Sequence, residues 1–270
     1  MFAIPPMQRA SHPSFHPSPE TSFNIDFPGG GIAKAIFASS HQVLPSVLKQ
    51  LNLQNPRPVL VLVGGAAGLR HYHFAKLHHI FTRVLAPIAQ SLNATVIDGG
   101  TDSGIMQLMG RARHQIQGSF PLIGVAPVGK ITFPAHPSPP TDATALEAHH
   151  THFVLVPEAQ PGAGSQWGDE SAWIAQIASL LTLKTASIAI VINGGEITWQ
   201  DALQNIQVGR PIVAINGTGR AADAMASALQ GNATDTRAER IVASGLLQAI
   251  DLENAEGLAK VITQTLSNRG

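Results

Sequence analysis

The sequence contains no cysteine, which excludes disulfide bonds, thiolate catalysis and cysteine-ligated zinc. Aromatic residues make up only 5% and charged residues only 13% of the 270 residues, whereas 44% are hydrophobic. Most of that hydrophobic fraction is aliphatic, a composition typical of buried parallel strands and of the helices that cover them. The chain therefore has ample material for the core of one large α/β domain.

Excess charge of either sign is also absent. The 17 Lys and Arg residues balance 17 Asp and Glu residues, so there is no basic surplus of the kind that a dedicated nucleic-acid-binding protein uses against phosphates. No run approaches the roughly 18 consecutive apolar residues of a membrane helix. The first residues also lack the apolar segment of a signal peptide. We expect no nucleic-acid partner, no membrane insertion and a cytoplasmic location.

The chain divides into a tail and one domain. Residues 1–28 are rich in Pro, Ser and His without a period, which predicts a flexible tail. From residue 29 to 270, apolar runs such as Val59–Val63 alternate with amphipathic stretches such as His71–Leu92, where Pro87 predicts a kink or break. Parallel strands need long crossovers that place helices on both faces of a sheet. The pattern predicts a Rossmann-like, doubly wound, mainly parallel sheet of about seven strands.

Four of the predicted strands end in glycine clusters, and a helix follows each of them. Strand ends meet at one edge of a parallel sheet, glycine allows close approach of a ligand, and helix N-termini favour anions. A single such junction is more often a tight turn, but four at one edge favour an anion or nucleotide site. The candidate ligand-binding residues at these junctions are Gly64, Gly65, Ala66, Gly68, Gly99, Gly100, Thr101, Ser103, Gly104, Asn193, Gly194, Gly195, Thr198, Gly217, Thr218, Gly219 and Arg220.

The turn from Gly217 to Arg220 combines a small backbone, a hydroxyl donor and a guanidinium suited to a phosphate. It is neither a Walker loop nor a dinucleotide fingerprint, because Ala222 occupies the place of the third glycine. The alternative is that Arg220 pairs with Asp223 on the helix surface.

Asp169 and Glu170 open another predicted helix. Their negative charges either stabilise the helix at the positive end of its dipole, or they contact ribose hydroxyls or a base amine of a ligand. The long loop Glu158–Gly168 before them is typical of a lid, and Trp167 in it either stacks on a base or anchors the loop.

Two histidine clusters are candidate metal ligands by composition, but we expect no metal site at either. In the first, the side chains on one helix side lie about two turns apart, too far for one ion. The second precedes a strand, which predicts a supporting role at the edge opposite the ligand cleft. The clusters are His71, His73, His78 and His79, then His149, His150 and His152.

Seven segments after the tail resemble the SLOG superfamily, the Rossmann-like domains shared by Smf/DprA and LOG proteins. The similarity is greatest to its prokaryotic branch, which resembles the N-terminal domain of TRPM cation channels. The resemblance implies a sensor domain for ADP-ribose-like or NAD-derived nucleotides, in a chain that forms homo-oligomers. The matching segments are VLVLVGGAAGL (Val59–Leu69), DGGTDSGIMQLMGRAR (Asp98–Arg113), PLIGVAP (Pro121–Pro127), LEAHHTHFVLVP (Leu146–Pro157), WGDESAWIAQIA (Trp167–Ala178), IAIVINGGEITWQD (Ile188–Asp201) and RPIVAINGTGRAAD (Arg210–Asp223).

LOG enzymes, a more distant branch, cleave the N-glycosidic bond of nucleoside monophosphates and carry the motif Pro-Gly-Gly-x-Gly-Thr-x-x-Glu. The corresponding stretch here begins at Asn193, has Ile197 in place of the third glycine, and has Asp201 in place of the catalytic Glu. The preceding helix, Glu170–Lys184, also lacks the arginine of those enzymes. The resemblance thus favours a non-catalytic nucleotide-binding protein. The alternative is a phosphoribohydrolase in which Asp201 and Glu196 would be the catalytic carboxylates.

Overall fold

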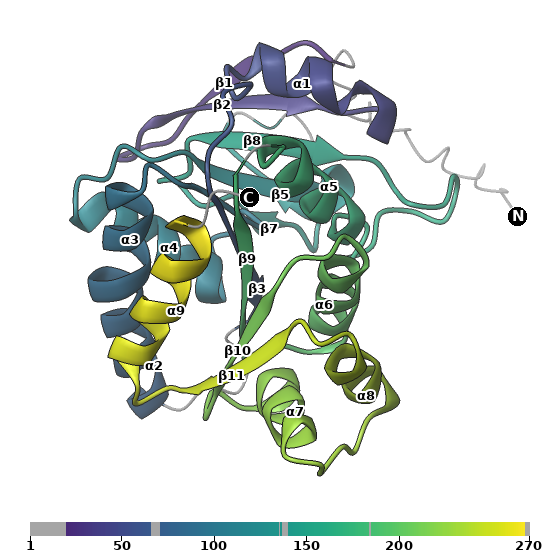
Figure 1. Ribbon diagram of the computed structural model, residues 1–270. Coiled ribbons are helices and arrows are strands. Elements are labelled where there is room, and N and C mark those ends of the chain that lie inside the picture. Colours follow the sequence, from purple (N-terminus) through teal and green to yellow (C-terminus); the bar gives the residue numbers. More distant parts are fainter. Residues whose placement is uncertain (1–19, 66–70, 135, 137–139, 184, 268–270) are drawn as a thin grey trace, which may run out of the picture.

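The computed structural model describes residues 20–65, 71–134, 136, 140–183 and 185–267. At its centre lies a sheet with the strand order β1-β2-β8-β5-β4-β3-β9-β10-β11 (Figure 1). Every neighbouring pair is parallel except β1 and β2. The strands are β1 (Phe23–Asp26), β2 (Ile32–Phe37), β3 (Val59–Gly64), β4 (Thr95–Asp98), β5 (Leu122–Pro127), β8 (His152–Val156), β9 (Ser187–Ile192), β10 (Ile212–Asn216) and β11 (Leu247–Asp251). Two short strands, β6 (Ile131–Thr132) and β7 (Thr144–Ala145), pair separately.

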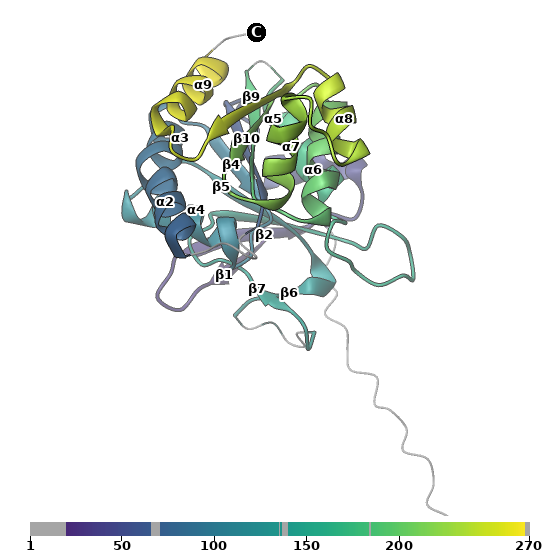
Figure 2. The ribbon, with the colours of Figure 1, turned by 90° about the horizontal axis from the view of Figure 1, so that it is seen from below.

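Helices cover both faces of this sheet, as Figures 1 and 2 show from two directions. The continuous apolar strands supply the middle layer, with alternate side chains packing into one of two buried clusters. On one face lie α1 (Leu44–Gln50), α5 (Ser171–Leu181), α6 (Glu196–Gln207), α7 (Arg220–Leu229) and α8 (Thr236–Ala243). On the other lie α2 (His71–Ile80), α3 (Ala86–Ser91), α4 (Gly104–Gln115) and α9 (Ala255–Ser267). The predicted Rossmann-like, doubly wound fold is confirmed.

The direction of winding reverses in the middle of the sheet. From β3 the chain proceeds through β4 and β5 to β8 on one side, and from β9 through β10 to β11 on the other. The adjacent strands β3 and β9 therefore lead away to opposite sides, and their carboxyl ends form a topological switch point. Ligands of open α/β sheets bind in such a crevice.

Three details of the prediction are corrected. The sheet has nine strands among the described residues instead of about seven. Part of the predicted tail is folded, because β1 pairs with β2 and the side chains of Ile25 and Phe27 are buried. Residues 1–19 lie outside the described ranges. Helix α8 was not predicted, since only Ala238 and Ile241 of its eight residues are buried and the apolar period is weak.

The sequence predicts a kink or break near Pro87, and the structure shows a change of helix type there without an interruption of the helical backbone. Helix α2 passes into one π-helical turn at Phe81–Leu85, and Pro87 lies in the first turn of α3. A proline has no N–H to donate to the preceding turn, so the regular α-helical ladder cannot continue through it. Across the described ranges, no helix is both long and apolar enough to cross a membrane.

Candidate ligand-binding site

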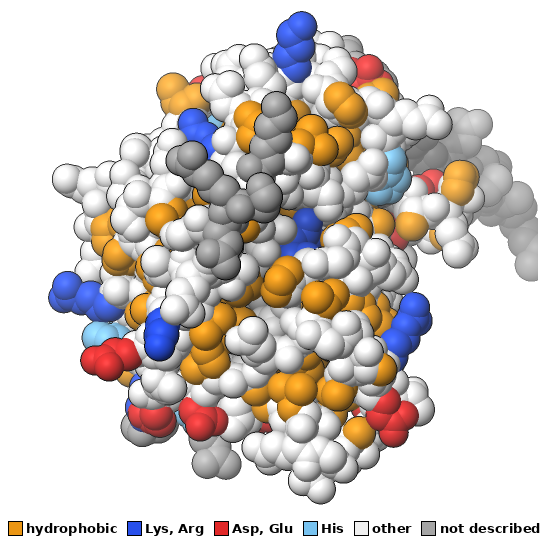
Figure 3. Space-filling model, viewed as in Figure 1, with side chains coloured by type: hydrophobic (Ala, Val, Ile, Leu, Met, Phe, Trp, Pro, Cys, Tyr) orange, Lys and Arg blue, Asp and Glu red, His pale blue; other side chains and the backbone are white. Residues whose placement is uncertain are grey.

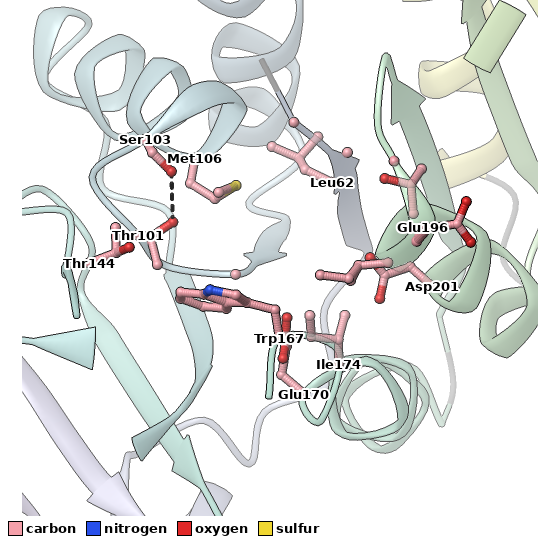
Figure 4. Close-up of a pocket in the computed structure, with 16 residues that line it drawn as sticks. Leu62, Thr101, Ser103, Met106, Thr144, Trp167, Glu170, Ile174, Glu196 and Asp201 are labelled. Carbon is pink, nitrogen blue, oxygen red and sulfur yellow. Dashed lines mark hydrogen bonds between the residues drawn. The ribbon is translucent and has the colours of Figure 1, made fainter. Parts of the chain in front are cut away.

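A pocket of about 390 Å³ opens at the switch point, beyond the carboxyl ends of β3, β4 and β9 (Figure 4). It is lined by glycine-rich turns, the first turns of two helices, and side chains from α5 and the loop before it. The lining residues are Leu62, Gly64, Gly65, Gly99, Thr101, Ser103, Met106, Thr144, Trp167, Glu170, Ile174, Gly195, Glu196, Ile197, Thr198 and Asp201.

The two glycines after β3 have different roles. Gly64 has a φ of +136°, and a β-carbon there would lie 2.0 Å from the carbonyl oxygen of Ile192 on β9. A side chain at this position would separate the two central strands. Gly65 has no atom of the described residues within 4 Å of its β-carbon position. Its missing side chain therefore keeps space open in the pocket.

The first turns of α4 and α6 bring helix N-termini to the pocket. Ser103 is the N-cap of α4 and Gly195 that of α6, and neither helix has a side-chain cap. Both capping residues line the pocket. Uncapped amides at the positive end of a helix dipole favour a bound anion, so this wall suits phosphate.

The sequence predicts that the N-terminus of α7 binds the ligand, but in the structure its N–H groups bond to carbonyl oxygens of the protein itself. The N–H groups of Ala221 and Ala222 donate to the carbonyl oxygens of Gly194 and Asn193, at 3.3 and 3.1 Å. Thr218 accepts a 2.8 Å bond from the Asn193 N–H through its hydroxyl, which also donates to Ile215. The turn at residues 217–219 thus holds the neighbouring Asn193–Gly194 turn in place and does not line the pocket, because its helix amides already have backbone acceptors.

Arg220 extends from this turn toward the rim of the pocket. A β-carbon on Gly195 would lie 2.7 Å from a guanidinium nitrogen of Arg220. Asp223 accepts a bond from the Gly217 N–H at 2.7 Å, and no Arg220–Asp223 ion pair forms among the described residues. The exposed guanidinium lies beside the uncapped start of α6, where it can meet an anion.

Two carboxyl groups face the pocket from α6 and the start of α5. Glu170 is 6% exposed and accepts a 2.8 Å bond from the Gly168 N–H. Burial raises the pKa of Glu170 to about 7, with a further contribution from the negative charges of Asp201 and Asp169. Burial also raises the pKa of Asp201 to about 6, against an opposing effect of the Ser171 hydroxyl. Coupled, raised carboxyl pKa values in a pocket are typical of functional sites.

Trp167 reaches the pocket from the loop before α5. It is half-buried and packs against the small cluster beneath β1, β2 and β8. The loop is ordered by Glu158, whose carboxylate accepts bonds from the N–H groups of Gly162 and Gly164 at 2.6 and 2.7 Å. Trp167 therefore anchors the loop and also presents its indole to the cavity, so both of the alternative roles weighed from sequence are compatible with its position.

A buried ionic network lies behind the Gly99–Gly100 turn. His150 bonds to Asp98 at 2.9 Å through Nε2 and to Glu147 at 2.8 Å through Nδ1. Although burial opposes charging, the two carboxylates raise the pKa of His150 to about 9. The Gly100 N–H also bonds to Asp98, at 2.7 Å. The expectation that His150 lies at the far edge is wrong, because Asp98 directly precedes the pocket turn; a supporting role fits its contacts.

The structure brings together ten of the predicted site residues: Gly64, Gly65, Gly99, Thr101, Ser103, Glu170, Gly195, Glu196, Thr198 and Asp201. It places others behind or beside the pocket: Gly100, Gly104, Asp169, Asn193, Gly194, Gly217, Thr218, Gly219 and Arg220. Gly100 packs on Gly124 and Phe153, and Gly194 on Thr198. Ala66 and Gly68 lie outside the described residues.

Besides Ile197, which the sequence marks only as a departure from the LOG motif, sequence reasoning missed four lining residues, Leu62, Met106, Thr144 and Ile174. They lie within a strand, on helix sides or in the Pro-rich segment, where no motif marks them. Their exposure to the cavity follows from packing alone. Within the described ranges, no group of three or more His, Asp or Glu residues is arranged to hold a metal ion.

The fold and the pocket define a Rossmann-like α/β protein with a ligand-sized cavity at its topological switch point. The particular family follows from comparison with known proteins. The chain belongs to the family described as SLOG in TRPM, prokaryote, whose profile matches residues 57–260.

Similar proteins include several cation channels. The Transient receptor potential cation channel subfamily M member-like 2 of Nematostella vectensis is 26% identical over 91% of this chain and 18% of its own length. Subfamily M member 2 of Mus musculus is 28% identical over 67% of this chain and 14% of its own length. The chain thus spans less than a fifth of these channels. The X-ray structure of TM1055, a structural-genomics target, aligns with a TM-score of 0.49 at 18% identity, covering 77% of this chain and 99% of that one.

Proposed function

We propose that the pocket binds a nucleotide of the ADP-ribose or NAD type and that the chain acts as a sensor domain. The observation that carries this proposal is the convergence of two uncapped helix N-termini, those of α4 and α6, on one cavity. Such a pair can hold the two phosphates of a nucleoside diphosphate group. Arg220 at the rim adds a cation without making the whole molecule basic.

The other walls suit the remaining parts of such a ligand. Trp167 offers an aromatic surface for a ring, while Glu170 and Asp201 can accept hydrogen bonds from hydroxyl or amino groups. Figure 4 shows these three side chains at the same cavity, with Asp201 on the side opposite Ser103. Membership of the TRPM-related SLOG family supports the proposal, because the resemblance implies nucleotide ligands of this class.

A thermal-shift panel tests the proposal. ADP-ribose and NAD should raise the melting temperature, and adenosine, which lacks phosphates, should do so far less. A ligand at about 100 times its Kd stabilises the native state by about 2.7 kcal/mol, enough for a clear shift. If no nucleotide in a broad panel shifts the transition at roughly 1 mM, a concentration that would detect even weak sites, the proposal is wrong.

A second candidate, hydrolysis of the N-glycosidic bond of nucleoside monophosphates, is favoured by one observation, the raised pKa of the buried Asp201 carboxyl. Glu196 suits this role less, because its side chain is 80% exposed and pairs with Arg237. We expect no turnover, since Ile197 takes the space of the motif's third glycine. Release of adenine from AMP, abolished in Asp201→Asn, would overturn that expectation.

A further inference from the structure

The pocket lining has an unbalanced charge. Among the described lining residues there are three carboxylates and no Lys, Arg or His. Glu196 is compensated by Arg237, whose Nη1 lies 2.6 Å from its carboxylate. Glu170 and Asp201 have no ion-pair partner in the described part of the chain. The negative charge of this pair is therefore left for something else to neutralise.

Burial makes that charge unfavourable in the empty pocket. Glu170 is almost fully covered, and Oδ1 of Asp201 is buried with no hydrogen-bond donor among the described residues. A buried carboxylate without a partner is destabilising, and an opposite charge brought close to it is strongly favoured. A ligand group that is cationic would gain most from this part of the pocket.

The rest of this wall indicates what kind of cation fits. The indole of Trp167 lies beside Glu170 in Figure 4, and aromatic faces attract cations. Leu62, Ile174 and Ile197 contribute apolar side chains to the lining of the same pocket. A compact, strongly hydrated ammonium would lose its water against these side chains. A flat ring with a delocalised charge would pack against them and keep its contact with the carboxylates.

We infer that this end of the pocket receives a positively charged heteroaromatic ring, with Trp167 against the ring and Glu170 and Asp201 as its counter-charge. The inference rests on the proposed function and makes it more specific. Within the NAD class, the oxidised nicotinamide ring is such a cation, whereas its reduced form is neutral. The pocket therefore selects the oxidised dinucleotide over the reduced one, and over ADP-ribose, which lacks the ring.

Calorimetric titration with NAD⁺, NADH and ADP-ribose at about pH 8, where both carboxyl groups are mainly ionised, tests this inference. NAD⁺ and NADH share every other group, so their difference isolates the contribution of the oxidised, cationic nicotinamide ring. We expect NAD⁺ to bind at least tenfold more tightly than NADH. The double substitution Glu170→Gln with Asp201→Asn should remove that preference. Glu239→Gln, which removes an exposed carboxylate on α8, is the matched control and should keep the preference.

The outcomes separate the two proposals. Failure of all three nucleotides to bind would overturn the proposed function. Binding of NADH as tight as, or tighter than, that of NAD⁺ would overturn the inference and leave nucleotide binding intact. A preference retained in the double variant would show that other groups select the charge, which also overturns the inference. The comparison in the wild-type chain stands even if a variant fails to fold, and single Glu170→Gln then replaces the double variant.

Discussion

His150 stabilises the Gly99–Gly100 turn, which lies beside the pocket. Its imidazole joins Asp98, which holds the Gly100 N–H, to Glu147, whose own backbone N–H donates to the Gly100 carbonyl at 2.9 Å. Glu147 also fills the space beside Gly110 on α4, where a β-carbon would lie 1.9 Å from its carboxylate. The network therefore fixes the turn between β4 and α4, which supplies the lining residues Gly99, Thr101 and Ser103.

Substitution of His150 by Gln should lower the free energy of unfolding in a pH-dependent way. The pKa of His150 rises from 6.5 to about 9 on folding, so its stabilisation is complete below about pH 6.5 and is lost as the pH rises through about 9. We expect a loss of about 3 kcal/mol near pH 6, typical of a broken buried ion pair, and a smaller loss above about pH 9.5. Urea denaturation at both pH values measures it.

His79→Gln is the control for this experiment, because His79 is exposed on α2. Its free energy of unfolding should match the wild-type value at both pH values. A deficit in His150→Gln that is equal at the two pH values would show that His150 is not charged in the native protein.

Arg220 gives a prediction about ligand binding. Arg220→Ala should weaken nucleotide binding at least tenfold, since one charge-assisted bond to phosphate contributes about 1.5–3 kcal/mol and about 1.4 kcal/mol corresponds to a factor of ten. The absence of an Arg220–Asp223 pair in the described chain predicts little change in melting temperature. Calorimetric titration and a melting curve measure the two effects. Unchanged affinity with a lowered melting temperature would remove Arg220 from the site.

At the scale of the elements, the alternation of strands and helices could be predicted because the central strands are largely apolar and glycine clusters follow four of them. Strand β1 could not, because it lies next to a Pro- and Ser-rich segment and buries only Ile25 of its four residues. The prediction that the turn before α7 lines the pocket is wrong for a different reason. The sequence shows that a helix begins here. It does not show that the carbonyl oxygens of Asn193 and Gly194 accept hydrogen bonds from the first N–H groups of that helix.

The junction of β3 and β9 offers a matched pair of substitutions. Gly64→Ala should destabilise the protein by several kcal/mol, because its β-carbon would meet the Ile192 carbonyl at 2.0 Å and its φ is positive. Gly65→Ala should leave the free energy of unfolding within about 0.5 kcal/mol, since no atom in the described part of the chain lies within 4 Å of its β-carbon position. The added methyl group would instead narrow the pocket and weaken nucleotide binding. Urea denaturation and titration of both variants measure the two effects.

The reverse pattern, a stable Gly64→Ala and an unfolded Gly65→Ala, would contradict the described register between these strands. Equal nucleotide affinity in Gly65→Ala and the wild type would place the ligand away from this turn.

For the molecule as a whole, charge distribution limits the partners. The net charge is zero, and Lys and Arg side chains are scattered over the face shown in Figure 3 instead of forming a stripe. Affinity for DNA at physiological salt comes mainly from clusters of such cations. We expect no binding of a 20–30 bp duplex, about two to three helical turns, by fluorescence anisotropy at about 0.15 M salt. Micromolar, salt-sensitive binding would contradict this expectation.

The central pairing of β3 with β9 also has a consequence for how the binding site forms during folding. Val59 faces Ser187 in this pairing, a separation of 187 − 59 = 128 residues along the chain. Contacts between such distant segments close large loops and are typical of slow, late steps in folding. The pocket wall at Gly99 and Thr101 comes before β9 along the chain, and the wall at Gly195–Asp201 comes after it. Both walls therefore come together only in the completed sheet, so we expect a ligand of the proposed kind to slow unfolding of the finished protein.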